Sequence, residues 1–318
     1  MMTEGGPADL IAMQRAVQRA WTPHSRWHIG DLAWQHTSLA EHPMALWRPA
    51  PDGEVAAWAV RTAPGRLELH APPELVDAVL SWFHETAGTG ERTVTAMAAD
   101  TALTGALRAA GYREAAEPYF LHCLRNLNAR TDDELPARPD DELPARPDDE
   151  LPAPRLPDGY RVRAVRPGEI AERAAVHRAA WRPQRVGWLH VPPVDFGDGE
   201  SGMTTERYAR IAATWPYRHD LDQVVEAPDG TLVASALGWY DEVNRVGLLE
   251  PVGTDPGHAR LGLGAAVSLA CLRAMRDAGA TLAVVRPRGD DAYPVPRALY
   301  HHIGFRDAGR TVTYRRPA

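Results

Sequence analysis

An eight-residue repeat divides the chain into two halves. Residues 132–155 read DDELPARP, DDELPARP and DDELPAPR, a segment rich in proline and acid and poor in large apolar side chains. Such a segment cannot bury enough apolar surface to fold alone, so we expect an extended linker. A docking tail for a partner is the alternative to a plain spacer. The whole chain of 318 residues has room for two cores, one on each side of this linker.

The two halves repeat short sequence signals in the same order. Residues 50–57 (APDGEVAA) recur as 227–234 (APDGTLVA), and in both copies the Asp-Gly pair predicts a turn between strands. Residues 106–112 (ALRAAGY) return as 298–305 (ALYHHIGF), with one extra residue. These echoes indicate an internal duplication. The predicted organisation is a domain at 1–128, a linker at 129–156 and a second domain at 157–318.

The composition excludes several classes of function. The net charge of −7 argues against a nucleic-acid partner, which normally meets a basic face. All 35 basic residues are arginine, and the absence of lysine excludes Schiff-base catalysis and a Walker-type phosphate lysine. Cys123 and Cys271 lie in apolar runs and are expected to be buried free thiols. We see neither a membrane span nor a secretory leader, so we expect a cytoplasmic protein.

Strand and helix signals indicate an α/β (α+β) layer fold with a mixed sheet. In the second half, strands are predicted at residues 223–226, 232–240, 245–253, 282–286 and 311–315. A helix over 167–181 would begin at Pro167, since proline suits the first helical position. Thr204 and Thr205 are N-cap candidates for a helix that carries Tyr208 and Ile211 on one face.

One helix start has the features of an anion site. The strand at 245–253 leads through Asp255-Pro256 to Gly262-Leu-Gly264, which opens an apolar helix that stops at Gly279. Glycines at a helix start leave backbone N–H groups uncovered by side chains. Those donors and the positive end of the helix dipole can hold a pyrophosphate. A full G-x-G-x-x-G is absent because Val267 occupies the third glycine position, which disfavours a Rossmann unit.

Residues 246–267, taken with 298–305, resemble the acyl-CoA-binding core of the GCN5-related N-acetyltransferases (GNAT). The resemblance implies two tandem GNAT-like domains, each a mixed, mostly antiparallel sheet flanked by helices, with acetyl-CoA as co-substrate. The family pattern Arg/Gln-x-x-Gly-x-Gly/Ala is met at 259–264 except at its first position, where Ala259 replaces a customary arginine. We therefore expect weaker rather than absent CoA binding. The residues implied to bind it are Val252, Gly253, Thr254, Arg260, Leu261, Gly262, Leu263, Gly264 and Ala265.

The resemblance also implies catalytic residues. Tyr300 lies four residues before Gly304, where the family places the general acid that protonates the departing thiolate. Glu250 lies on the strand that lines the cleft in this family and would assist deprotonation of an amine; the alternative is an outward-facing strand residue. No metal is expected. His301 and His302 point about 100° apart on a helix, and no Cys/His spacing suggests zinc.

The expected acceptor is an amine of a small molecule. Asp241, Trp181 and Trp188 are candidates for binding it, although packing is the alternative for both tryptophans. Neither a nucleic acid nor a membrane is an expected partner, and a homodimer is compatible with the sequence. The first half is predicted to be catalytically empty. Leu107 stands at the position of Tyr300, and two prolines replace the glycine pair in its segment 70–75.

Two other functions remain open at this point. A mycothiol synthase-like acetyltransferase is a rival within the same class, since that family is also a tandem GNAT. A non-catalytic acyl-CoA-binding or sensor protein is a rival from another class, because Ala259 and an empty first half would suit a fold that is losing its chemistry. A transferase acting on a protein N-terminus or a lysine is a third, weaker alternative.

Overall fold

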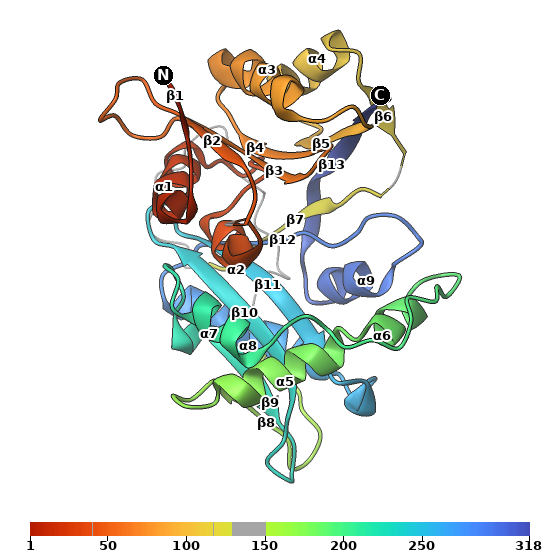
Figure 1. Cartoon of the computed structure of the whole chain (residues 1–318). Coiled ribbons are helices and arrows are strands. Elements are labelled where there is room, and N and C mark those ends of the chain that lie inside the picture. The colour runs from red at the N-terminus through yellow and green to blue at the C-terminus, as the bar shows by residue number, and fades with distance from the viewer. Residues whose placement is uncertain (40, 117, 129–150) are drawn as a thin grey trace. The chain divides into compact units, whose positions relative to one another are not determined.

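The chain folds into two compact units, seen in a computed structural model (Figure 1). The structure describes residues 1–39, 41–116, 118–128 and 151–318. The predicted linker therefore lies outside the described residues, apart from 151–156. Within that short end, the carbonyl oxygen of Leu151 accepts a hydrogen bond from Arg273 at 2.5 Å.

Each unit includes a strand from the end of the other half of the chain. The first unit comprises residues 1–122 and 308–318, and the second comprises 123–307. The observed division thus differs from a simple cut at the linker. Strand β7 enters the second unit at residue 123, and strand β13 enters the first at residue 308. Strand pairing is a long-range choice that local sequence signals do not encode.

The first unit is a mixed, mostly antiparallel sheet with helices. Its strands follow the order β1-β2-β3-β4-β5-β13, and β6 also pairs with β13. Among the strand pairs of the described residues in this unit, only β4 and β5 run parallel. The strands are β1 (Met2–Glu4), β2 (Met44–Trp47), β3 (Ala57–Ala63), β4 (Arg66–His70), β5 (Arg92–Met97), β6 (Arg113–Ala115) and β13 (Arg306–Arg316). The helices are η1 (Pro7–Asp9), α1 (Leu10–Ala20), α2 (Ile29–Leu39), η2 (Pro73–Leu75), α3 (Val76–Thr86) and α4 (Thr101–Ala109).

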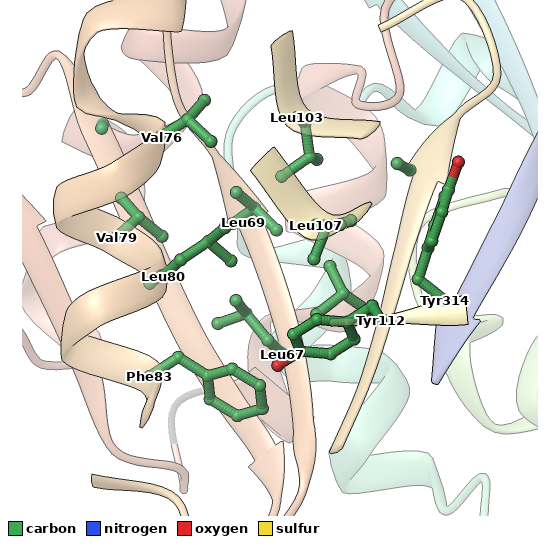
Figure 2. Packing of buried hydrophobic residues seen from close by; sticks show 14 of the residues in the cluster. Leu67, Leu69, Val76, Val79, Leu80, Phe83, Leu103, Leu107, Tyr112 and Tyr314 are labelled. Carbon is green, nitrogen blue, oxygen red and sulfur yellow. The ribbon is translucent and has the colours of Figure 1, made fainter. Parts of the chain in front are cut away.

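Successive side chains of strand β3 point to opposite faces of this sheet, and each face carries its own apolar core. Ala57 and Ala59 belong to the cluster that α3 and α4 cover, whereas Trp58 and Val60 belong to the cluster that includes α1. Figure 2 shows the first of these clusters, with leucines of β4 facing the apolar side of α3. Leu107 of α4 is fully buried in the same cluster.

The second unit has the same plan. Its strands follow the order β7-β12-β11-β10-β9-β8, and within the part of this unit that the structure describes only β11 and β12 run parallel. The strands are β7 (Leu121–Asn126), β8 (Arg161–Ala164), β9 (Asp222–Glu226), β10 (Leu232–Asp241), β11 (Val246–Thr254) and β12 (Leu282–Val285). The helices are α5 (Ile170–Ala180), α6 (Pro183–Trp188), α7 (Thr205–Ala212), η4 (His219–Leu221), η5 (Pro256–His258), α8 (Leu263–Asp277) and α9 (Val295–His302).

Helix α8 lies close against the sheet because two strands present glycine to it. A Cβ atom at Gly247 would lie 2.4 Å from Sδ of Met275, and one at Gly238 would lie 2.8 Å from Sγ of Cys271. Real Cβ contacts are never that short, so these glycines set the helix-to-sheet distance. The predicted apolar helix and its burial are confirmed, since Val267, Cys271 and Met275 are all fully buried.

The predicted helix ends agree with the structure, with one exception. Thr204 caps α7 by accepting a hydrogen bond from the amide of Arg207 at 3.1 Å. Gly279 follows α8 with φ +110°, a left-handed conformation that suits glycine. The predicted start at Pro167 is wrong, because α5 begins at Ile170. Gly168 has φ +91°, which does not continue a helix.

Two further expectations can be compared with the described residues. Cys123 and Cys271 are buried free thiols, as predicted. Among the helices of the described ranges, none combines the length and the apolar character that crossing a bilayer requires.

Candidate active site

In the second unit, the ladder between β11 and β12 ends before β11 does. Strand β11 pairs with β12 only from Val246 to Leu248, yet it continues to Thr254. Beyond Leu248, the described residues give β11 no ladder partner on its β12 side. The edge of β11 beyond Leu248 on that side is therefore a candidate position for a ligand that lies alongside the strand.

A β-bulge turns the end of β11 toward a different helix. The pairing of β10 with β11 shifts between Ala236 and Gly238. Gly247 and Gly253 would face the same side of a regular strand, but Gly247 meets Met275 of α8, whereas Gly253 meets Ala180 and Trp181. The bulge is the physical reason, because one extra residue reverses the alternation beyond it.

The loop between β11 and α8 forms an uncapped helix start. Asp255 binds the amide of Gly257 at 2.7 Å, and Arg260 and Gly262 then adopt left-handed conformations with φ +65° and +76°. No side chain of the described residues caps α8 at Gly262. The first amides of α8 and its dipole therefore offer an anion site of the kind predicted for Gly262 and Gly264.

Neighbours of this loop keep its backbone accessible. Leu261 and Gly262 are exposed, and a Cβ atom at Gly264 would lie 3.4 Å from Oγ1 of Thr254, an ordinary contact distance. Val252, Gly253 and Thr254 end β11, and Arg260, Leu261, Leu263 and Ala265 surround the helix start.

His258 is a loop residue to which the sequence analysis assigned no role. Its Nδ1 lies 2.9 Å from the hydroxyl of Tyr160, and the two rings meet edge to face at 5.9 Å. This contact joins η5 to the start of β8. It supports the loop at the point where Ala259 supplies no cation.

Tyr300 and Glu250 come together from α9 and β11. The Tyr300 side chain is 8% exposed and its ring packs edge to face against Phe305 at 5.9 Å. Burial raises the pKa of the Tyr300 hydroxyl well above its ordinary value, and the negative charge of Glu250 raises it further. Glu250 is half-buried, and its backbone oxygen accepts a hydrogen bond from Trp239 Nε1 at 2.8 Å.

The predicted acceptor residues occupy different places. Trp181 follows α5 and lies against Gly253, with its ring stacked on His177 at 5.8 Å, so it borders the end of β11. Trp188 of α6 is 60% exposed. Asp241 is not brought to the site: its buried carboxylate accepts hydrogen bonds from the amides of Val243 and Asn244 and organises the β10–β11 turn. Its structural role is that of a turn residue.

The sequence analysis missed the contacts that hold α6 against the loop after β12. Arg288 pairs with Asp290 at 2.7 Å and lies 3.3 Å from Nε2 of His190. Nδ1 of His190 lies 2.9 Å from the backbone oxygen of Val186. A neutral ring protonated at Nδ1 satisfies both contacts, since it donates to Val186 and accepts from Arg288. Nothing in the local sequence indicates the contact between Arg288 and His190, because the two residues lie 98 positions apart.

The matching positions of the first unit carry residues of a different kind. Its helix α3 is preceded by η2, with Pro72 before it and Pro73 at its first position. Proline supplies no N–H group for an anion. Leu107 of α4 stands where α9 carries Tyr300, and it is buried in the apolar core.

Comparison with solved protein structures identifies similar folds. No protein-family model and no curated protein sequence matches the chain. Solved structures do match it over its whole length. A tandem GNAT protein from the clavulanic acid biosynthesis pathway has a TM-score of 0.60 at 14% identity, covering 100% of this chain and 98% of its own. A GCN5-related N-acetyltransferase from Sphaerobacter thermophilus has a TM-score of 0.56 at 21% identity, covering 100% and 95%.

A third structure agrees with these two. A GNAT-family acetyltransferase from Colwellia psychrerythraea has a TM-score of 0.55 at 11% identity, and 99% of each chain is covered. The chain therefore has the GNAT fold, in the tandem form that the sequence predicts. At these identities the likeness establishes the fold, and the function rests on the residues of the site.

Proposed function

We propose that the second unit transfers an acetyl group from acetyl-CoA to an amine of a small molecule. The observation that carries the proposal is the uncapped start of α8 beside the open edge of β11. An anion site at one end and a strand edge beyond the β11–β12 ladder at the other suit a long ligand with a pyrophosphate and a thioester. The likeness in fold to acetyltransferases supports the same reaction class.

In the proposed reaction, the acceptor amine attacks the thioester carbonyl carbon. Backbone N–H groups of β11 would stabilise the developing oxyanion, and Pro251 is excluded as a donor because it has no N–H. The amine loses its proton to Glu250. The carbon–sulfur bond then breaks, and the thiolate takes the hydroxyl proton of Tyr300.

The pairing of Glu250 with Tyr300 suits this order of proton transfers. The charge of Glu250 raises the pKa of Tyr300, so the tyrosine stays protonated while Glu250 is ionised. When Glu250 receives the amine proton, that charge disappears. The Tyr300 proton then becomes easier to donate at the stage when the thiolate forms.

Calorimetric titration of the full chain with acetyl-CoA, followed by thiol release with a panel of primary amines, tests the proposal. Gly262→Val is the informative variant, because a β-branched residue is strained at φ +76° and would cover the helix start. Gly230→Val is the matched control: its φ is +88°, and, like Gly262, it has no atom within 4 Å of an added Cβ.

We expect Gly262→Val to abolish acetyl-CoA binding and Gly230→Val to retain it. Equal binding by both variants would overturn the assignment of the site to α8. Binding without turnover for any amine would instead favour an acyl-CoA sensor. Release of thiol with a sugar-linked cysteine alone would favour the mycothiol synthase-like reaction.

A further inference from the structure

Three potential metal ligands meet on the surface of the second unit. The Sγ atom of Cys123, the imidazole of His301 and the carboxylate of Asp307 place their ligand atoms within 4.8 Å of one another. Cys123 comes from β7, His301 from α9 and Asp307 from the start of β13. We propose that these residues bind a divalent transition-metal ion, with Zn²⁺ as the natural occupant.

The distances suit such an ion. Cys123 Sγ lies 3.3 Å from Oδ1 of Asp307, and His301 Nε2 lies 2.7 Å from the same oxygen. Ligand atoms around a tetrahedral Zn²⁺ are roughly 3.3–3.8 Å apart, given bond lengths of about 2.0–2.3 Å. The His301–Asp307 separation is that of a hydrogen bond, and only a modest widening of this exposed pair would admit the ion.

The chemistry of the three groups favours zinc over a harder cation. Sulfur and imidazole nitrogen are preferred zinc ligands, whereas Mg²⁺ and Ca²⁺ prefer sites made only of oxygen. Binding would convert the Cys123 thiol into a metal-bound thiolate and release its proton to water. Three protein ligands leave the fourth tetrahedral position to a water molecule.

The three ligand residues differ in how far they are exposed to solvent. The side chains of His301 and Asp307 are 41% and 49% exposed, so an ion can reach them from solvent. Cys123 is fully buried and would close the site from below. Cys123 and Asp307 are 184 residues apart in the sequence, so no local sequence motif indicates the cluster.

The site would affect α9, the helix that carries Tyr300. An ion held between β7, α9 and β13 would fix the last turn of α9 through His301. This residue directly follows Tyr300 in the sequence. This inference does not rest on acetyl transfer, because the ligand geometry is independent of any acyl-CoA site. Failure of one proposal therefore leaves the other standing.

Titration of the reduced, metal-free full chain with Co²⁺ tests the proposal directly. A cobalt–thiolate bond gives a charge-transfer absorption in the near ultraviolet, and Zn²⁺ should displace it. We expect one equivalent of Co²⁺ to produce this band, and we expect Cys123→Ser to remove it. His301→Ala and Asp307→Asn should weaken Zn²⁺ binding at least about 100-fold, since even indirect ligand partners change metal affinity 10–100-fold.

The chain offers two matched controls. His302→Ala removes the neighbouring exposed imidazole of the same helix, and Cys271→Ser removes the other thiol. Both variants should bind Zn²⁺ as the wild type does. Absence of the charge-transfer band in the wild type, or equal losses for His301→Ala and His302→Ala, would overturn the site. His301 and Asp307 are exposed, so their variants keep the test informative if Cys123→Ser fails to fold.

Discussion

Arg173 of α5 donates a hydrogen bond from Nε to Oδ1 of Asp222 at 2.7 Å, and neither side chain is exposed to solvent. Tyr208 and Tyr217 also donate to this carboxylate, through Oδ2. A buried charge is tolerated only when it is paired and hydrogen-bonded in this way. The cluster attaches α5 and α7 to β9.

Asp222→Asn should destabilise the protein strongly, because it leaves the Arg173 guanidinium buried without a counter-charge. Breaking such a pair typically costs about 3–5 kcal/mol of unfolding free energy. Asp220→Asn is the control, since its partner Arg218 is also on the surface and an exposed pair is worth about 0–1 kcal/mol. Urea unfolding of both variants measures the difference in unfolding free energy. Similar losses in the two variants would show that the buried pair stabilises the protein no more than the exposed pair does.

Tyr300→Phe should lower kcat while leaving the Kd for acetyl-CoA unchanged. The ring and its packing against Phe305 remain, and only the proton donor is lost. General acids typically contribute about 10²–10⁴-fold to a rate. Tyr240→Phe, near the opposite end of α8 beside Gly279, should leave both quantities unaltered. An unchanged kcat in the Tyr300 variant would remove the tyrosine from the mechanism.

The stability of the protein should fall on acidification partly because of His177. Burial, reinforced by the positive charge of Arg173, lowers the pKa of His177 to about 3. In the unfolded chain its pKa is about 6.5, so the unfolded state binds the extra proton as pH falls below that value. This group alone should cost about 1.5–2 kcal/mol between pH 7 and pH 5.

Urea unfolding of His177→Gln at the two pH values measures this contribution. The variant cannot take up the proton, so its loss of stability between pH 7 and pH 5 should be smaller than that of the wild type by the same amount. A loss as large as that of the wild type would mean that His177 is charged in the folded protein.

Two glycine substitutions should have opposite effects on stability. Gly253→Ala would place a Cβ atom 2.7 Å from Cβ of Ala180 and should cost roughly 1–3 kcal/mol, as overpacking does. Gly105→Ala, in the middle of α4, meets no atom within 4 Å and should gain about 0.5–1 kcal/mol through its helix propensity. Thermal unfolding of the two variants distinguishes them, and a stabilised Gly253→Ala would contradict the close packing of β11 on α5.

Much of the candidate site was predictable because its signals are local. The strand predicted at residues 245–253 is observed at 246–254, and the helix predicted to open at Gly262 and Gly264 begins at Leu263. Glycine conformation, turn residues and apolar periodicity act within a few residues, so they can be read without knowing the fold. The roles of Glu250 and Tyr300 came instead from a family resemblance, and they stay predictions.

The amino-acid sequence by itself determined the two-part plan and the glycine-opened helix. That the first half has no site, because prolines and Leu107 replace glycines and a tyrosine, stays a prediction. Only the tertiary structure decided which strands complete each unit, that Asp241 belongs to a turn, and that Cys123, His301 and Asp307 converge. The physical reason is the distance along the chain over which each kind of interaction acts. Turn and helix signals depend on neighbours along the chain, whereas strand exchange and ligand clusters depend on packing between residues far apart in sequence.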